Sequence, residues 1–220
     1  MAIRTKINTS NFANESSIRI DFNYVNYLNN TDINSKLSKF ILAKENQTAD
    51  PPEEFKYVEI GDLNSKGKIS PNKVNLNIRN FDNEDLIKKI ENGNIQSVEI
   101  NDILISSVRP NLRKIIIIDE KINKYFFTKA FHKIKSRINP KICFYLLKYA
   151  YANTLNSIAR MGKGYPTLKI DDILSAKINE LSFLNFIKNE EKILKKINEI
   201  ESKIQKYSEN LIDEKETINN

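Results

Sequence analysis

The chain has 220 residues, of which 40% are hydrophobic and 29% charged, as is usual for a globular domain with an extension. Its apolar runs are too short to cross a bilayer, and its single cysteine, Cys143, has no partner for an internal disulfide, so we expect a cytoplasmic protein without membrane association. The net charge of +7 is uneven: residues 103–170 hold 14 Lys and Arg but only 2 Asp and Glu, while both flanking segments are slightly acidic. This pattern favours binding to a polyanion, with a solvated basic surface as the alternative.

The first half of the chain has the composition of strands and turns. Residues 56–60 form a short extended run that ends at Gly61 and Asp62, and a second turn signal follows at residues 65–68. Residues 85–91 predict a short helix that ends at Gly93.

The clearest β feature is a hairpin. Residues 102–108 and 114–118 are two strand-like runs, and the five residues between them are rich in turn formers. We interpret Arg109, Asn111 and Arg113 in this connection as candidate readers of base edges, because Arg pairs with guanine and Asn with adenine through two hydrogen bonds. The alternative is that the arginines only solvate an exposed turn.

Residues 125–128 are a further strand candidate, and a helix is expected after them. Asn139 is its expected N-cap and Pro140 its first residue. A set of apolar side chains then follows at helical spacing before Gly162 stops the helix: Ile142, Tyr145, Leu146, Tyr149 and Leu155. Cys143 is interpreted as a small buried residue. His132 is the only histidine, so a His-rich metal site is excluded. We interpret it as a surface or DNA-facing residue.

The loop of residues 159–168 combines two glycines with basic and aromatic side chains, so its backbone is suited to press against phosphates, although an ordinary turn has the same composition. We expect phosphate contacts from a set of basic residues in this loop and before the helix: Lys133, Lys135, Arg137, Arg160 and Lys163. Tyr165 is expected to pack or stack.

The C-terminal segment, residues 183–218, carries a heptad pattern without Gly or Pro. The expected seam consists of Phe186, Ile193, Ile197, Ile200, Ile204, Tyr207 and Leu211. At about 1.5 Å per residue, the helix would be a rod of roughly 54 Å. Its apolar stripe requires a second helix, from another copy of the chain or from another protein; a helix lying back on its own domain is the alternative.

Several segments, taken in order, resemble the specificity (S) subunit of type I restriction–modification enzymes. The segment YVEIGDL at residues 57–63 is similar to one near the start of a recognition domain in that family, and DILISSVRPN at residues 102–111 to a later one. The order continues with a helix after Asn-Pro, then the segment YPTLKIDDIL at residues 165–174, and it ends with a long closing helix. In addition, RID at residues 19–21 is similar to a motif near the N-terminus of such domains. Before the long helix, INELSF at residues 178–183 lacks the family's usual proline-rich strand and Gln.

The resemblance implies an α+β protein, with a mixed α/β target-recognition domain over residues 1–180 and a long C-terminal coiled-coil helix over residues 181–220. It implies a non-catalytic, sequence-specific DNA-binding subunit that directs an adenine methyltransferase, which uses S-adenosylmethionine, and possibly a restriction subunit to a bipartite target in double-stranded DNA. A full S subunit has two recognition domains and two long helices. The resemblance therefore implies either a half-subunit that forms a homodimer or pairs with a second specificity half, or a fragment of a longer chain.

We expect no cofactor and no active site, since the chain lacks a glycine-rich methyl-donor loop, a methyltransferase motif and a P-loop. Three alternatives remain open. Asp102 and Asp119 follow a nuclease-like pattern in which two carboxylates converge on a metal ion. A coiled-coil adaptor with an incidental basic patch is the second, and an RNA-binding module without an aromatic RNA-binding motif is the third.

Overall fold

The structure, a computed structural model, describes residues 24, 27–28, 35–45, 48–78, 81–161 and 164–218. The chain divides into two compact units, unit 1 (Met1–Asn179) and unit 2 (Glu180–Asn220), which are described separately. The motif at residues 19–21 lies outside the described residues. The mixture of helices and strands confirms the expected α+β class.

The first sheet of unit 1 contains the predicted hairpin. Its strand order is β2-β9-β6-β7, and all neighbouring strands are antiparallel. Ile103 pairs with Ile117 and Ile105 with Ile115, which confirms the hairpin and its register. The four strands are β2 (Ile41–Ala43), β6 (Ile103–Ser106), β7 (Ile115–Ile117) and β9 (Phe131–Ser136).

The second sheet of unit 1 is mixed. Its order is β4-β3-β8-β5, with β3 and β8 parallel and the other pairs antiparallel. The strands expected at residues 56–60 and 125–128 are both members of it. The four strands are β3 (Glu54–Val58), β4 (Asn72–Asn75), β5 (Ile95–Gln96) and β8 (Phe126–Thr128).

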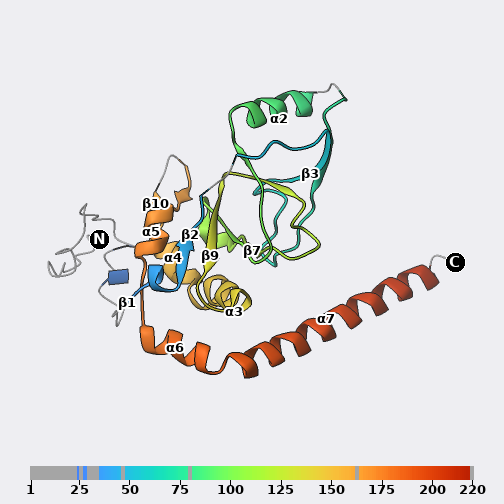
Figure 1. Cartoon of the computed structure of the whole chain (residues 1–220). Coiled ribbons are helices and arrows are strands. Elements are labelled where there is room, and N and C mark those ends of the chain that lie inside the picture. Colours follow the sequence, from blue (N-terminus) through green and yellow to red (C-terminus); the bar gives the residue numbers. More distant parts are fainter. Residues whose placement is uncertain are drawn as a thin grey trace, which may run out of the picture. The chain divides into compact units, whose positions relative to one another are not determined.

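The two sheets and their helices form layers (Figure 1). One core cluster joins the sheets, since it includes Val58 and Phe127 from one and Leu104 and Phe131 from the other. A second core cluster packs helix α2 (Phe81–Glu91) on the outer face of the mixed sheet. The helix expected at residues 85–91 is thus present and starts four residues earlier.

The predicted helix after Asn139 is present but interrupted. Helix α3 (Pro140–Tyr145) starts with Asn139 as the N-cap, whose side-chain oxygen accepts hydrogen bonds from the amides of Lys141 and Ile142. The π-helical turn η4 (Leu146–Ala150) and helix α4 (Ala152–Ser157) follow. A π turn contains more residues than an α turn, so it changes which side chains of the following residues point into the core. Tyr149, expected to face inward, is therefore 55% exposed, and Lys148 is buried instead.

Three short pairings and turns complete unit 1. Strand β1 (Ser35–Lys36) pairs with β12 (Lys177–Ile178), and β10 (Arg160–Met161) pairs with β11 (Pro166–Thr167). The 3₁₀ turn η2 (Leu37–Lys39) precedes β2, and helix α5 (Ile170–Ser175) follows β11. Cys143 is buried, as expected, and burial raises the pKa of its thiol to about 11.

Unit 2 consists of helix α6 (Glu180–Lys188) and the long helix α7 (Glu190–Ile218). Only Asn189 separates them, and backbone hydrogen bonds from its amide to Asn185 and from Ile193 to its carbonyl run across the junction. The predicted long helix is therefore confirmed, with this one junction. Its seam residues Ile200, Ile204 and Tyr207 are 57–70% exposed. The side chains of Phe186 and Leu211 lie outside the described ones. Among the described helices, none is both long and apolar enough to cross a membrane.

Candidate nucleic-acid interface

The turn of residues 109–113 has an uncommon backbone. Its centre is the 3₁₀ turn η3 (Pro110–Leu112), and the arginines on both sides are left-handed, with φ 50° at Arg109 and φ 51° at Arg113. Non-glycine residues seldom adopt positive φ, and they keep it only where the surrounding structure holds them. Pro110 is buried, whereas both arginines and Asn111 are exposed. The fold thus fixes the backbone of this turn and leaves the three predicted base readers facing solvent.

The β10–β11 hairpin lies directly against this turn. The amide of Arg109 donates to the carbonyl of Pro166 at 2.8 Å, and the amide of Leu168 donates to the carbonyl of Ser107 at 2.7 Å. The guanidinium of Arg109 lies over the ring of Tyr165, 5.4 Å from its centroid. Two loops that the sequence treats separately are therefore one surface.

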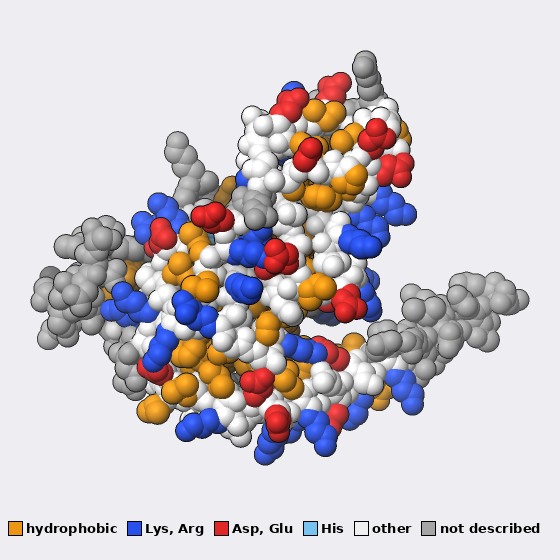
Figure 2. All heavy atoms as spheres, viewed as in Figure 1, with side chains coloured by type: hydrophobic (Ala, Val, Ile, Leu, Met, Phe, Trp, Pro, Cys, Tyr) orange, Lys and Arg blue, Asp and Glu red, His pale blue; other side chains and the backbone are white. Residues whose placement is uncertain are grey.

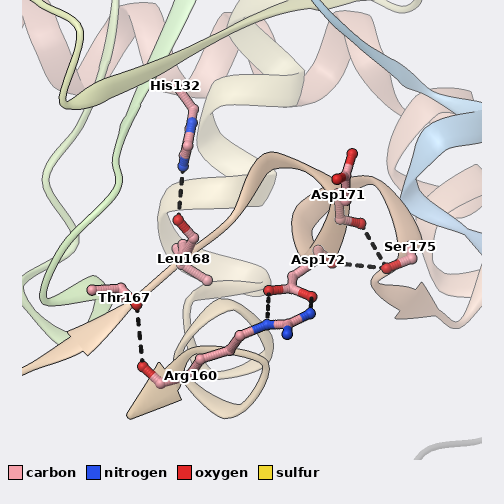
Figure 3. A network of polar contacts seen from close by, with 7 residues as sticks. All are labelled: His132, Arg160, Thr167, Leu168, Asp171, Asp172 and Ser175. Carbon is pink, nitrogen blue, oxygen red and sulfur yellow. Dashed lines mark hydrogen bonds and ion pairs between the residues drawn. The ribbon is translucent and has the colours of Figure 1, made fainter. Parts of the chain in front are cut away.

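Ion-pair and hydrogen-bond contacts anchor the hairpin (Figure 3). Arg160 donates two hydrogen bonds to the carboxylate of Asp172 in α5, at 2.7 and 2.6 Å. At the other end, the Nε2 atom of His132 lies 2.8 Å from the carbonyl oxygen of Leu168. Arg160, expected to contact phosphate, therefore holds the hairpin in place. His132 is half-buried, and its contact with Leu168 also holds the hairpin in place.

Lys148 connects a third loop, the turn of residues 64–68, to the surface formed by the turn of residues 109–113 and the β10–β11 hairpin. This lysine is 1% exposed, and its Nζ donates to the carbonyl of Ile115, the first residue of β7, at 2.9 Å. The turn of residues 64–68 packs on it, since a Cβ placed on Gly67 would lie 2.9 Å from the same Nζ. The backbone at Gly67 therefore lies near the start of β7, and the side chains of Lys66 and Lys68 on either side of it are exposed. The residue types at positions 65–68 predict a turn here, but they do not link the turn to the hairpin.

We call the turn of residues 64–68, the turn of residues 109–113 and the β10–β11 hairpin the loop cluster. It brings together Arg109, Asn111, Arg113 and Tyr165 of the predicted site. Lys163 lies outside the described residues. Lys169, which follows the hairpin, is exposed and adds a basic group that the sequence analysis missed.

Three predicted phosphate contacts on or after β9 lie elsewhere. Lys133 is 3% exposed and donates to the carbonyl of Ser97 at 3.0 Å, because its strand position faces the interior between the sheets. Burial also lowers the pKa of Lys133. It does not present its ammonium group to solvent, and the expectation of a phosphate contact at Lys133 is wrong for this structure.

Lys135 and Arg137 are exposed, but they lie at the far end of β9 from the loop cluster. Phe131 pairs with Ser106, next to the turn of residues 109–113, whereas Ile134 pairs with Ile103 at the start of β6. At about 3.3 Å per residue, Arg137 is about 20 Å from Phe131 along the strand. The predicted basic residues therefore do not form one continuous patch.

The carboxylates of the nuclease hypothesis have other partners. Asp102 is 2% exposed and accepts from the Nζ of Lys44 at 3.0 and 3.1 Å. Burial lowers the pKa of Lys44, but its bonds to Glu99 and Asp102 outweigh this effect and raise it overall. Asp119 is exposed and accepts from the amide of Lys121 in its own turn. Within the described residues, no group of three or more His, Cys, Asp or Glu side chains is suited to a metal ion.

Charge is distributed unevenly over unit 1 as well as along the sequence. On the face shown in Figure 2, acidic side chains gather over α2, where Glu84, Asp85 and Glu91 belong to this helix. The loop cluster contains no Asp or Glu among its described residues. A polyanion would therefore meet favourable charge at the loop cluster and repulsion at α2.

Comparisons with known proteins identify the fold. No protein-family model matches the chain, and no curated protein matches it. Among solved structures, seven chains match. One of them comes from a study of the structural basis of complex assembly and conformational transition in the type I R-M system. It matches 80% of this chain with a TM-score of 0.50 and 18% sequence identity. The chain shares its fold with a component of a type I R-M system.

Another match is the HsdS subunit from Thermoanaerobacter tengcongensis, with a TM-score of 0.49 and 18% identity over 76% of this chain. The match with a TM-score of 0.50 confirms, at the level of the fold, the resemblance to type I restriction–modification proteins that the sequence motifs indicated. The chain spans less than half the length of these two structures, 46% and 43% respectively.

Proposed function

We propose that the chain is a non-catalytic DNA-binding specificity module of a type I restriction–modification system, and that the loop cluster reads the base sequence. The observation that carries this proposal is the convergence of the turn of residues 109–113 and the β10–β11 hairpin. Two arginines and an asparagine, the residue types that make bidentate contacts with guanine and adenine, are exposed there on a constrained backbone. A module that reads sequence needs such donors on a constrained backbone, and the left-handed residues that flank this turn support the proposal.

Phosphate contacts in this proposal come from exposed basic residues around the loop cluster. Lys66, Lys68 and Lys169 take the place that the sequence analysis gave to Lys133 and Arg160. Lys135 and Arg137, about 13 Å and about 20 Å from Phe131 along β9, are suited to backbone contacts farther along the duplex, since one turn of B-DNA measures about 34 Å. Each such contact adds salt-dependent affinity without sequence information.

Unit 2 supplies the partner-binding part of the proposal. The exposed seam of α7 would pair with the same helix of a second copy, or with that of a second specificity half. The paired module would read two half-sites and direct an adenine methyltransferase, with or without a restriction subunit, to a bipartite target. The chain's coverage of less than half of the matched structures is consistent with one half of such an arrangement.

The test is selection of preferred duplexes from a random pool by the full-length chain, followed by affinity measurements on single variants. We expect Arg113→Ala to relax preference at one base position, at a loss of roughly 1–3 kcal/mol, or about 5- to 150-fold in affinity for the preferred site. Arg137→Ala, which removes an exposed arginine at the far end of β9, is the matched control. It should weaken all duplexes about equally and lower the salt dependence. If the wild-type chain selects no sequence, the proposal is wrong.

One observation favours a second candidate, a coiled-coil adaptor. The seam of α7 is exposed at Ile200, Ile204 and Tyr207, and pairing alone would account for it. Retention on immobilised duplex DNA that falls with salt separates the two functions. An adaptor with an incidental basic surface would show neither sequence selection nor an effect of Arg113→Ala.

A further inference from the structure

We propose that Tyr165 is a positioning residue, whose ring holds the Arg109 guanidinium in the orientation needed to read the O6/N7 edge of a guanine. The base preference contributed by the turn of residues 109–113 then depends on the β10–β11 hairpin. This inference rests on the proposed DNA-reading function and deepens it, since it names the base and the device that selects it.

The backbone of Arg109 is already fixed. Its left-handed conformation, with φ 50° and ψ 58°, is followed by the rigid ring of buried Pro110. Its amide donates to Pro166, and the adjacent Val108 forms a β-bridge with Thr167. The direction in which the side chain leaves the backbone is therefore set by the hairpin. What remains free is the rotation of the side chain itself.

Tyr165 limits this remaining freedom. The guanidinium carbon of Arg109 lies 5.4 Å from the centroid of the tyrosine ring, within the range of a cation–π contact. Stacking uses one face of the planar guanidinium, whereas bidentate recognition of guanine uses the N–H groups at its edge. A stacked arginine thus keeps its donors for a base. Arg160 shows the opposite case, because its donors are bonded to Asp172.

The ring itself stands on an anchored platform. Arg160 ties the first strand of the hairpin to α5, and the contact between Leu168 and His132 ties the residue that follows the second strand to β9 (Figure 3). Tyr165 is 41% exposed, so the stacked pair is accessible from solvent. An arginine that is restrained before binding loses less side-chain entropy when it meets the base. Restraint by Tyr165 therefore favours the geometry that distinguishes guanine from other bases.

The test uses the preferred duplex with guanine or 7-deazaguanine at the base position where Arg109→Ala relaxes selection. 7-Deazaguanine lacks N7 and keeps O6, so the affinity ratio of the two duplexes measures recognition of N7. A cation–π contact of this exposure is worth about 0.5–1 kcal/mol, equivalent to about 2- to 5-fold. We expect Tyr165→Leu to reduce the affinity ratio by about this factor and to leave binding to a non-specific duplex unchanged. Tyr165→Phe, which keeps the ring, should retain the wild-type ratio.

The controls separate this inference from the function on which it rests. Tyr149→Leu removes a tyrosine of similar exposure outside the loop cluster and should change nothing. Circular dichroism of each variant checks that it folds. If the wild type selects sequence but Tyr165→Leu keeps the full ratio, or Tyr165→Phe loses it, the inference is wrong and the proposed function stands. If Arg109→Ala relaxes selection at no position, or at one that prefers a base other than guanine, Arg109 does not read guanine and the inference also fails. If the wild type selects no sequence, both are wrong.

Discussion

Replacement of the buried Lys148 by methionine should abolish a rise in stability that the wild-type protein shows at alkaline pH. Lys148 is 1% exposed, lies over the ring of Phe144 and donates to the carbonyl of Ile115. Burial lowers the pKa of its ammonium group to about 8, against about 10.4 for a lysine in water. The folded protein therefore releases this proton at a lower pH than the unfolded chain does.

The sign of the effect follows from this difference. Below about pH 8, Lys148 is charged in both states, so the full penalty of burying the charge is present. Between about pH 8 and 10.4, the unfolded chain binds more protons than the folded protein, and the free energy of unfolding rises with pH. At about 1.4 kcal/mol per pH unit, the complete rise is about 3 kcal/mol, and most of it lies between pH 7 and 10.

The assay is urea unfolding of the wild type and of Lys148→Met at several values between pH 7 and 10. Methionine keeps much of the side-chain volume and the contact with Phe144 but carries no charge. The difference in stability between the two proteins should move in favour of the wild type by about 2 to 3 kcal/mol over this range. Other groups cancel in the difference, including Tyr57, whose pKa burial raises to about 12.

Lys169→Met is the matched control, since it removes an exposed lysine and should preserve the wild-type dependence on pH. A constant difference between the wild type and Lys148→Met from pH 7 to 10 would refute the reasoning. It would mean that the Lys148 ammonium group is solvated in the folded protein, and that the Lys148–Ile115 contact does not tie η4 to β7.

Two further predictions concern the helices. Asn139→Ala removes the acceptor for two amides at the start of α3 and should lower the free energy of unfolding by about 1 kcal/mol. Asn139→Asp can still cap the helix and should lower this free energy less. Thermal or urea unfolding measures both variants. Ile200→Lys should disrupt the proposed helix pairing of unit 2, because loss of about 2 kcal/mol of apolar burial per copy, about 4 kcal/mol per dimer, raises the dimer Kd several hundred-fold. Sedimentation at several concentrations reports this, with Ser202→Lys as the control outside the seam; equal dissociation of both variants would show that the seam is not the interface.

Local patterns in the sequence predicted local structure well. The two apolar runs on either side of residues 109–113 predicted the β6–β7 hairpin, and Asn139-Pro140 predicted the start of α3. Both predictions succeeded because turns and helix caps depend on residues that are neighbours in the chain. The periodicity of residues 183–218 gave the long helix. The side chains of α3–η4 were predicted less well. One π turn changed which of Lys148 and Tyr149 is buried, and helical spacing alone does not reveal such a turn.

The candidate site was predictable in its parts but not in its assembly. Arg109 and Tyr165 were each identified from local composition, but their contact depends on a β-bridge between Val108 and Thr167, which are far apart in the chain. Lys133 has the same residue type as Lys135, and only the packing of the two sheets decides that one is buried. Charge patterning locates a basic segment, but it does not show which of its members share a face.

The backbone of the turn of residues 109–113 has a consequence for how this surface can diverge between related chains. Positions 109 and 113 require positive φ, which Gly, Asn and Asp tolerate better than most residues, so substitution there is restricted by conformation. Asn111 is exposed and has no such restriction, and Met161 on the neighbouring hairpin is 72% exposed. Changes at these two positions would alter what the surface recognises while the core stays the same. We therefore expect new specificities to arise first at positions 111 and 161, where the backbone accepts most residue types.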